Sequence, residues 1–102
     1  MPFENEPAIN NVLQSIRMIP AEAAINALEM AASHLNRMYQ AEKNGHPIDP
    51  RANRDELAKN PTLSLTIAAL LAAAPDLLMA ADLAKAVRKV KLAQAGRSTL
   101  IQ

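Results

Sequence analysis

The sequence predicts an all-α fold, a bundle of four to five helices, on three observations. Alanine (21 residues) and leucine (13) dominate the hydrophobic residues, whereas β-branched and aromatic residues are scarce. Alanine and leucine favour helices, and strands favour the scarce types. Five of the seven prolines stand at or near the start of a run with helical periodicity, and both glycines follow such a run. Proline suits the first turn of a helix, and glycine suits the position just after its end.

The first two predicted helices cover residues 7–19 and 20–44. In the first, apolar residues recur at spacings of four and three and form one stripe: Ile9, Leu13 and Ile16. In the second, two heptad-like series lie side by side, which are Ala24, Leu28, Ala31, Leu35 and Met38, and Ala21, Ile25, Leu28, Ala32, Leu35 and Tyr39. Together they form a face broad enough for two neighbouring helices. We expect this helix to be the main packing scaffold and to end at Gly45.

Three further helices are predicted at 50–59, 61–74 and 76–95. The helix at 50–59 is polar apart from Leu57 and is expected to be a surface connector. Asn60 and Pro61 form a cap and first-turn pair for the next helix, which is apolar almost all round. Such a helix is either the most buried one or one covered by a partner. Pro75 and Asp76 interrupt it and open the last helix, which Gly96 is expected to close.

Length and composition bound the class of protein. The 102 residues predict a single helical domain over 1–102, with short flexible ends at 1–6 and 97–102. A net charge of +1 does not by itself indicate a nucleic-acid or membrane partner. The absence of cysteine excludes disulfides and thiolate metal sites. The acidic N-terminus lacks the pattern of a signal peptide, so we expect a cytoplasmic location.

The hydrophobic stretch at 62–84 is long enough to raise the question of a membrane span. It carries Pro75 and Asp76 in its middle, and an aspartate at the centre of a bilayer costs about 2.5–3.5 kcal/mol. We therefore expect two helices packed in a core rather than one helix crossing a membrane.

A basic face on the last helix is the main candidate binding site. Lys85, Arg88, Lys89 and Lys91 cover a sector of about 160° of the helix. Three interpretations stay open: a solvated face, a surface for nucleic-acid phosphates, or a site for an acidic protein partner. The helix has no aromatic residue for base stacking. On the long helix, Tyr39 is a further candidate contact, because tyrosine is enriched at interaction hot spots.

No pattern in the chain predicts catalysis, a cofactor or a metal. The two histidines, His34 and His46, have no set of converging ligands around them in the sequence. The two widely separated glycines cannot form a phosphate-binding loop. We expect a non-catalytic protein–protein interaction module, a small regulator, adaptor or inhibitor, that self-associates and binds a protein partner. The alternative is a small nucleic-acid-binding regulator that uses the basic face of the C-terminal helix.

Overall fold

The structure is a computed structural model that describes residues 6–46 and 57–101, and these residues form helices joined by short turns. The helices are α1 (Glu6–Ser15), α2 (Ala21–Lys43), α4 (Pro61–Ala73) and α5 (Leu77–Ile101). The prediction of an all-α helical bundle is confirmed. The short helix predicted at 50–59 lies largely outside the described residues, although Leu57 and Ala58 at its end are helical.

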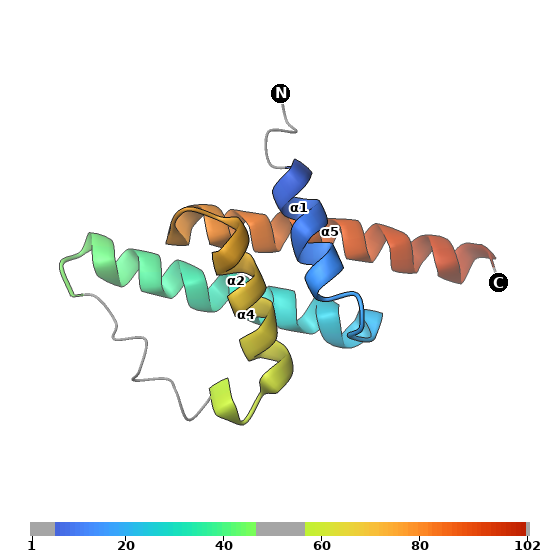
Figure 1. The fold of residues 1–102 in the computed structure, drawn as a ribbon, viewed down its shortest axis with the longest axis horizontal. Coiled ribbons are helices and arrows are strands. Elements are labelled where there is room, and N and C mark those ends of the chain that lie inside the picture. Colours follow the sequence, from blue (N-terminus) through green and yellow to red (C-terminus); the bar gives the residue numbers. More distant parts are fainter. Residues whose placement is uncertain (1–5, 47–56, 102) are drawn as a thin grey trace.

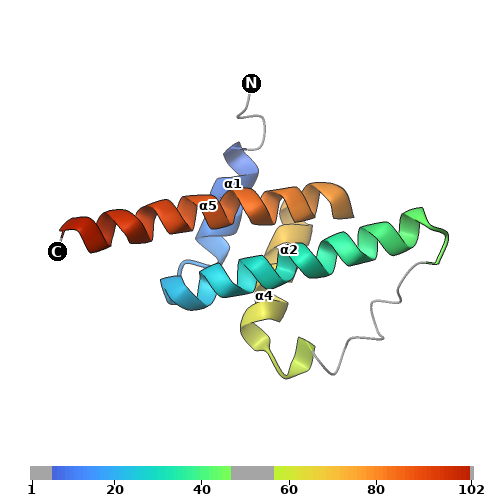
Figure 2. The same cartoon turned by 180° about the vertical axis from the view of Figure 1, so that it is seen from behind.

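The helices form two crossed layers. The long helices α2 and α5 run antiparallel to each other in one layer, and α1 and α4 cross them in the other (Figure 1 and, from behind, Figure 2). The most extensive contact joins α2 to α5, and α2 also packs against α4. The broad apolar face of α2 therefore meets two neighbours, as its sequence predicts.

The first helix ends earlier than its apolar pattern predicts, at Ser15 rather than Ile19. The Ser15 hydroxyl donates a hydrogen bond to the carbonyl oxygen of Asn11 (3.0 Å). After it, the Ile19 amide donates to the Ile16 carbonyl (3.0 Å), which is a tighter turn than an α-helix makes. Pro20 keeps Ile19 out of the helix, because proline disfavours helical geometry in the residue before it.

The helix α2 ends just before Gly45, as the sequence predicts. Gly45 has a φ of +82°, and its amide donates to the Glu42 carbonyl (3.1 Å). The next amide, of His46, reaches back to the Ala41 carbonyl (2.9 Å). These two bonds form a Schellman motif, in which a left-handed residue lets the chain satisfy the last carbonyls of the helix.

Side-chain caps start the last two helices. The Asn60 Oδ1 accepts a hydrogen bond from the Leu63 amide (3.1 Å), with Pro61 in the first turn of α4. The Asp76 Oδ1 accepts one from the Met79 amide (2.8 Å) at the start of α5. The break between α4 and α5 bends the chain by 116°. The predicted roles of Asn60 and Asp76 as starting points are confirmed.

The last helix does not stop at Gly96. It continues to Ile101, so the prediction of a helix end at 95 is wrong. A glycine ends a helix when it adopts a positive φ, and Gly45 is the glycine of this chain that does so. Gly96 instead lies inside α5, where a glycine lowers helix stability without preventing the helix.

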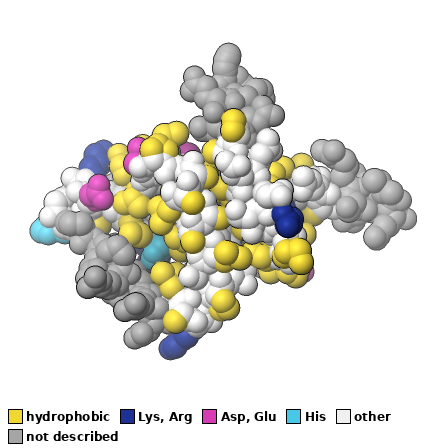
Figure 3. Space-filling view, viewed as in Figure 1, with side chains coloured by type: hydrophobic (Ala, Val, Ile, Leu, Met, Phe, Trp, Pro, Cys, Tyr) yellow, Lys and Arg dark blue, Asp and Glu magenta, His cyan; other side chains and the backbone are white. Residues whose placement is uncertain are grey.

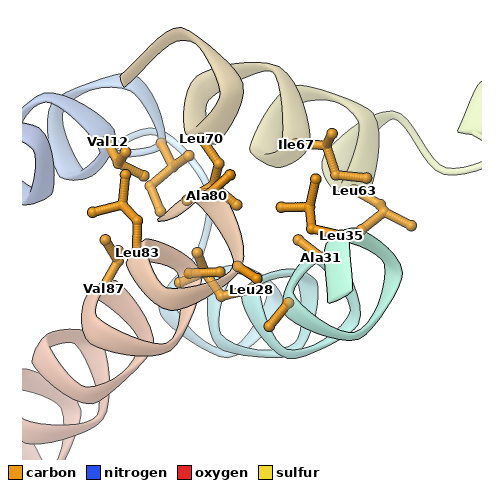
Figure 4. Packing of buried hydrophobic residues seen from close by; sticks show 14 of the residues in the cluster. Val12, Leu28, Ala31, Leu35, Leu63, Ile67, Leu70, Ala80, Leu83 and Val87 are labelled. Atoms are coloured by element: carbon orange, nitrogen blue, oxygen red, sulfur yellow. The ribbon is translucent and has the colours of Figure 1, made fainter. Parts of the chain in front are cut away.

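The core lies between the two layers, where all four helices contribute buried side chains (Figure 4). Leu28 and Leu35 of α2, Leu70 of α4 and Val87 of α5 are fully buried. The two long helices, which make the most extensive contact, bury several alanines: Ala24, Ala27, Ala31 and Ala32 on α2, and Ala80, Ala81 and Ala84 on α5. Small side chains of this kind let the two helices approach closely.

Candidate functional site

Three of the five predicted binding residues come together in one groove. Lys85, Arg88 and Lys89 of α5 line a hollow of about 420 Å³ that α2 borders on its other side. The residues that α2 contributes are Glu29, Ala32, Ser33 and Asn36. We call this hollow the basic groove. Residues three and four positions apart lie on one face of a helix, so the groove runs along about two turns of α2 and about one turn of α5.

The ion pair between Arg88 and Glu29 joins the two walls of the basic groove. The Arg88 Nη2 donates to the Glu29 Oε2 at 3.1 Å. The two side chains are 35% and 65% exposed, so solvent screens the pair, and its contribution to stability is at most about 1 kcal/mol. The pair therefore positions the guanidinium more than it stabilises the fold.

The same guanidinium has an unused donor. The Arg88 Nε is buried, and it has no hydrogen-bond partner among the described residues. A guanidinium binds an oxyanion best through two parallel N–H groups, and Glu29 uses one. Arg88 is thus held by a single bond at the edge of a groove that two lysines also line.

The structure separates the other two predicted residues from the basic groove. Lys91 is half-buried and lies four positions after Val87, so it continues the buried side of α5 rather than the groove side. Tyr39 is half-buried and lies four positions after Leu35 on α2. Neither residue is part of the lining of the basic groove. The 160° basic sector predicted for α5 is therefore divided between two sides of the helix.

A larger groove of about 730 Å³ lies on the other side of the ridge that Glu29 and Ser33 form on α2. Its lining is mixed, with six polar residues and three apolar ones: Asn26, Glu29, Ser33, His34, Arg37 and Asn60, and Met30, Leu57 and Leu63. Among the described residues, no group of three or more histidine, aspartate or glutamate side chains is placed to hold a metal ion.

An apolar surface on α4 is the second notable feature. The helix buries one face through Leu63, Thr66, Ile67 and Leu70, but the opposite face is exposed. Its burial is therefore one-sided, although its sequence is apolar all round. We call four exposed apolar residues of this face, which are Leu65, Ala68, Leu71 and Ala72, the outer α4 patch; the exposed Ser64 lies beside them. Figure 3 looks onto this layer: hydrophobic side chains spread over its middle, and charged ones lie towards its edges.

Sequence reasoning missed the α2 wall of the basic groove. Glu29, Ser33 and Asn36 recur on the polar side of α2 and carry no motif. Glu29 and Arg88 are 59 positions apart, so their pairing depends on how the helices pack. The outer α4 patch did leave a signal, namely an unbroken apolar sequence, but that signal does not say which face is covered.

In the two described ranges, no single helix has the length and hydropathy needed to cross a membrane. The segments Pro61–Ala73 and Leu77–Gly96 reach that threshold only as a pair, across the 116° bend. Comparison of the chain with protein-family models, with curated proteins and with solved structures finds no match.

Proposed function

We propose that this protein is a non-catalytic interaction module, a small regulator, adaptor or inhibitor, that self-associates through the outer α4 patch. The observation that carries the proposal is the exposure of large apolar side chains on α4. Leu65 is 48% exposed and Leu71 is 43% exposed. Contiguous exposed apolar residues on a small protein are typical of interaction sites.

The chemistry of α4 favours a second copy of the chain as the occupant of the patch. No charged residue occurs from Pro61 to Pro75, so two copies can approach without placing like charges opposite each other. An acidic or basic partner would gain no electrostatic attraction there. Leucines and alanines also alternate along the patch. In an antiparallel pair of α4 helices, the leucines of one copy can therefore pack over the alanines of the other.

The exposed residues at the start of α5 extend the apolar character beyond the α4 helix. Leu78 is 41% exposed and Met79 is 38% exposed, directly after the bend that joins the two helices. A two-fold pairing through α4 would bring these residues near the edge of the interface. Burial of such side chains contributes about 25 cal/mol per Å² of apolar surface removed from water.

The test is the mass of the protein across a dilution series, measured by sedimentation equilibrium. We expect the wild type to shift from monomer to dimer as concentration rises. Leu71→Lys should weaken the dimer at least about tenfold, because the substitution places a charge in an apolar contact. The matched control is Leu92→Lys on α5, since Leu92 is 42% exposed and lies outside the patch.

Two results would contradict this proposal. A wild type that stays monomeric at every concentration removes self-association. An equal effect of Leu92→Lys and Leu71→Lys removes the assignment to α4, because it would mean that added charge acts without regard to position.

A second candidate function, nucleic-acid binding, is favoured by the line of cations along α5. Lys85, Arg88 and Lys89 border one groove. A surface that neutralises phosphates binds duplex DNA or RNA with an affinity that falls steeply as salt rises. Reversing the charge at Arg88 and Lys89 should abolish that binding. Absence of binding at low salt would exclude this candidate.

A further inference from the structure

We infer that the basic groove is a binding site for a single phosphate monoester group. This inference is independent of self-association, because the groove lies between α2 and α5 and the outer α4 patch lies on another helix. It assigns a ligand class to residues that the interaction proposal leaves without a role.

The charge of the groove supports a doubly negative ligand. Three cationic side chains line it against the single carboxylate of Glu29, which leaves a net charge of two positive units. A phosphate monoester carries close to two negative charges at neutral pH. One such group would balance the groove, whereas a singly charged carboxylate would leave an excess of positive charge.

The donors of the groove fit a tetrahedral oxyanion. Ser33 and Asn36 on α2 supply neutral hydrogen-bond donors opposite the ammonium groups of Lys85 and Lys89. Ala32 also lines the hollow, and its small side chain does not fill it. Phosphate oxygens thus meet donors from both walls of the groove.

Arg88 supplies the directional part of the site. Its Nη2 already has an acceptor in Glu29 at 3.1 Å, and its buried Nε has no partner within the described part of the chain. A buried N–H without a partner is costly, so a ligand that offers a second oxygen relieves that cost. A small rotation of the side chain would turn both N–H groups towards the groove and away from Glu29.

This arrangement makes Glu29 a competitor for the ligand. Its carboxylate occupies Arg88 when the groove is empty and repels an incoming anion. Removing the charge at Glu29 should therefore tighten binding, whereas removing charge at Arg88, Lys85 or Lys89 should weaken it. The opposite signs distinguish a binding site from a set of structural contacts.

The test is a titration with inorganic phosphate, followed by ¹H–¹⁵N NMR of backbone amides and of the Arg88 Nε–H. We expect saturable shifts confined to the groove residues and a displaced Nε–H resonance. Arg88→Gln should weaken binding about tenfold or more, because a charge-assisted bond is lost. Glu29→Gln should tighten it about fivefold or more, because a unit charge about 4 Å away repels each charge of the ligand by that factor even in water.

Two further variants keep the test decisive if Arg88→Gln impairs folding. The double variant Lys85→Gln/Lys89→Gln changes exposed residues only and should also weaken phosphate binding about tenfold. Lys91→Gln removes one charge from the same helix, as Arg88→Gln does, so it is the matched control for that single variant and should leave the affinity within about twofold.

The inference would be overturned by three results. Non-saturable shifts with tens of millimolar phosphate would show general ionic attraction. An effect of Lys91→Gln as large as that of the double variant would show that the total positive charge of α5, rather than the groove, attracts phosphate. Duplex DNA that binds with dependence on Lys91 as well as the groove cations would show an extended phosphate surface.

A second arm of the titration distinguishes two sources of the phosphate group, a small metabolite and a phosphorylated protein. Free O-phosphoserine and a short phosphoserine peptide are compared with the unphosphorylated peptide. Equal affinity for both phosphorylated probes indicates a small metabolite as ligand, and tighter peptide binding indicates a phosphorylated protein. Binding of the unphosphorylated peptide with equal affinity would overturn the inference.

Discussion

Two neighbouring leucines of α4 provide the sharpest test of the fold. Leu70 is fully buried and Leu71 is 43% exposed, although they are adjacent in the sequence. The same substitution, to alanine, therefore acts on opposite faces of one helix. Differences in helix propensity cancel in this comparison, so the two variants differ only in packing.

The expected magnitudes follow from burial. Leucine to alanine removes three carbons, each contributing about 0.8 kcal/mol when buried, which gives about 2.4 kcal/mol at Leu70. The cavity left in the core adds to this loss, and the total is expected to be about 3–4 kcal/mol. At Leu71 about half of the side chain is already in water and solvent fills the space, so we expect a loss of about 1 kcal/mol.

Urea denaturation followed by far-UV circular dichroism measures both losses, at a concentration low enough to keep the protein monomeric. The midpoint should fall much further for Leu70→Ala than for Leu71→Ala, at an unchanged slope. In thermal unfolding, Leu70→Ala should lower Tm by at least about 12 °C. Equal losses, or a larger loss at Leu71, would mean that α4 is rotated about its axis, and the reasoning that places Leu63 and Ile67 in the core would fail with it.

The other expected effects concern helix ends. Gly45→Ala should destabilise the protein by about 1 kcal/mol, since its φ of +82° is strained for alanine. Gly96→Ala should instead stabilise it by about 0.5–1 kcal/mol, because Gly96 is helical and an added Cβ meets nothing within 4 Å; a loss of stability would contradict the extension of α5. Asn60→Ala and Asp76→Ala should each cost about 0.5–2 kcal/mol in chemical denaturation, since each removes a cap. Unchanged midpoints would show that these caps do not hold in solution.

The helix boundaries set by local chemistry could be predicted from the sequence. Asn60 and Asp76 bond to amides three positions away, and Gly45 ends a helix through its own φ. Gly96 could not be assigned in the same way. A glycine permits a helix end but does not require one, and the chain after it continues as a helix.

The sequence could not predict which side of α4 is buried or which residues line the basic groove. A helix that is apolar all round has no preferred side in its pattern, so Leu70 and Leu71 could not be told apart. The cations of α5 were visible as a cluster, but their counterpart, Glu29, stands 59 positions before Arg88. Only the antiparallel packing of α2 and α5 brings these two residues together.

The two crossed layers make the molecule a thin slab, 49 Å by 36 Å by 17 Å. Its radius of gyration is 14.0 Å, above the value of about 13 Å typical of a folded chain of this length. A flat particle experiences more friction than a sphere of equal mass, so it migrates through a gel-filtration column as if it were heavier. A monomer of this protein can therefore elute earlier than a sphere of its mass, so its apparent mass lies above that of one chain. Retention volume alone would misreport stoichiometry, and light scattering or equilibrium centrifugation would not.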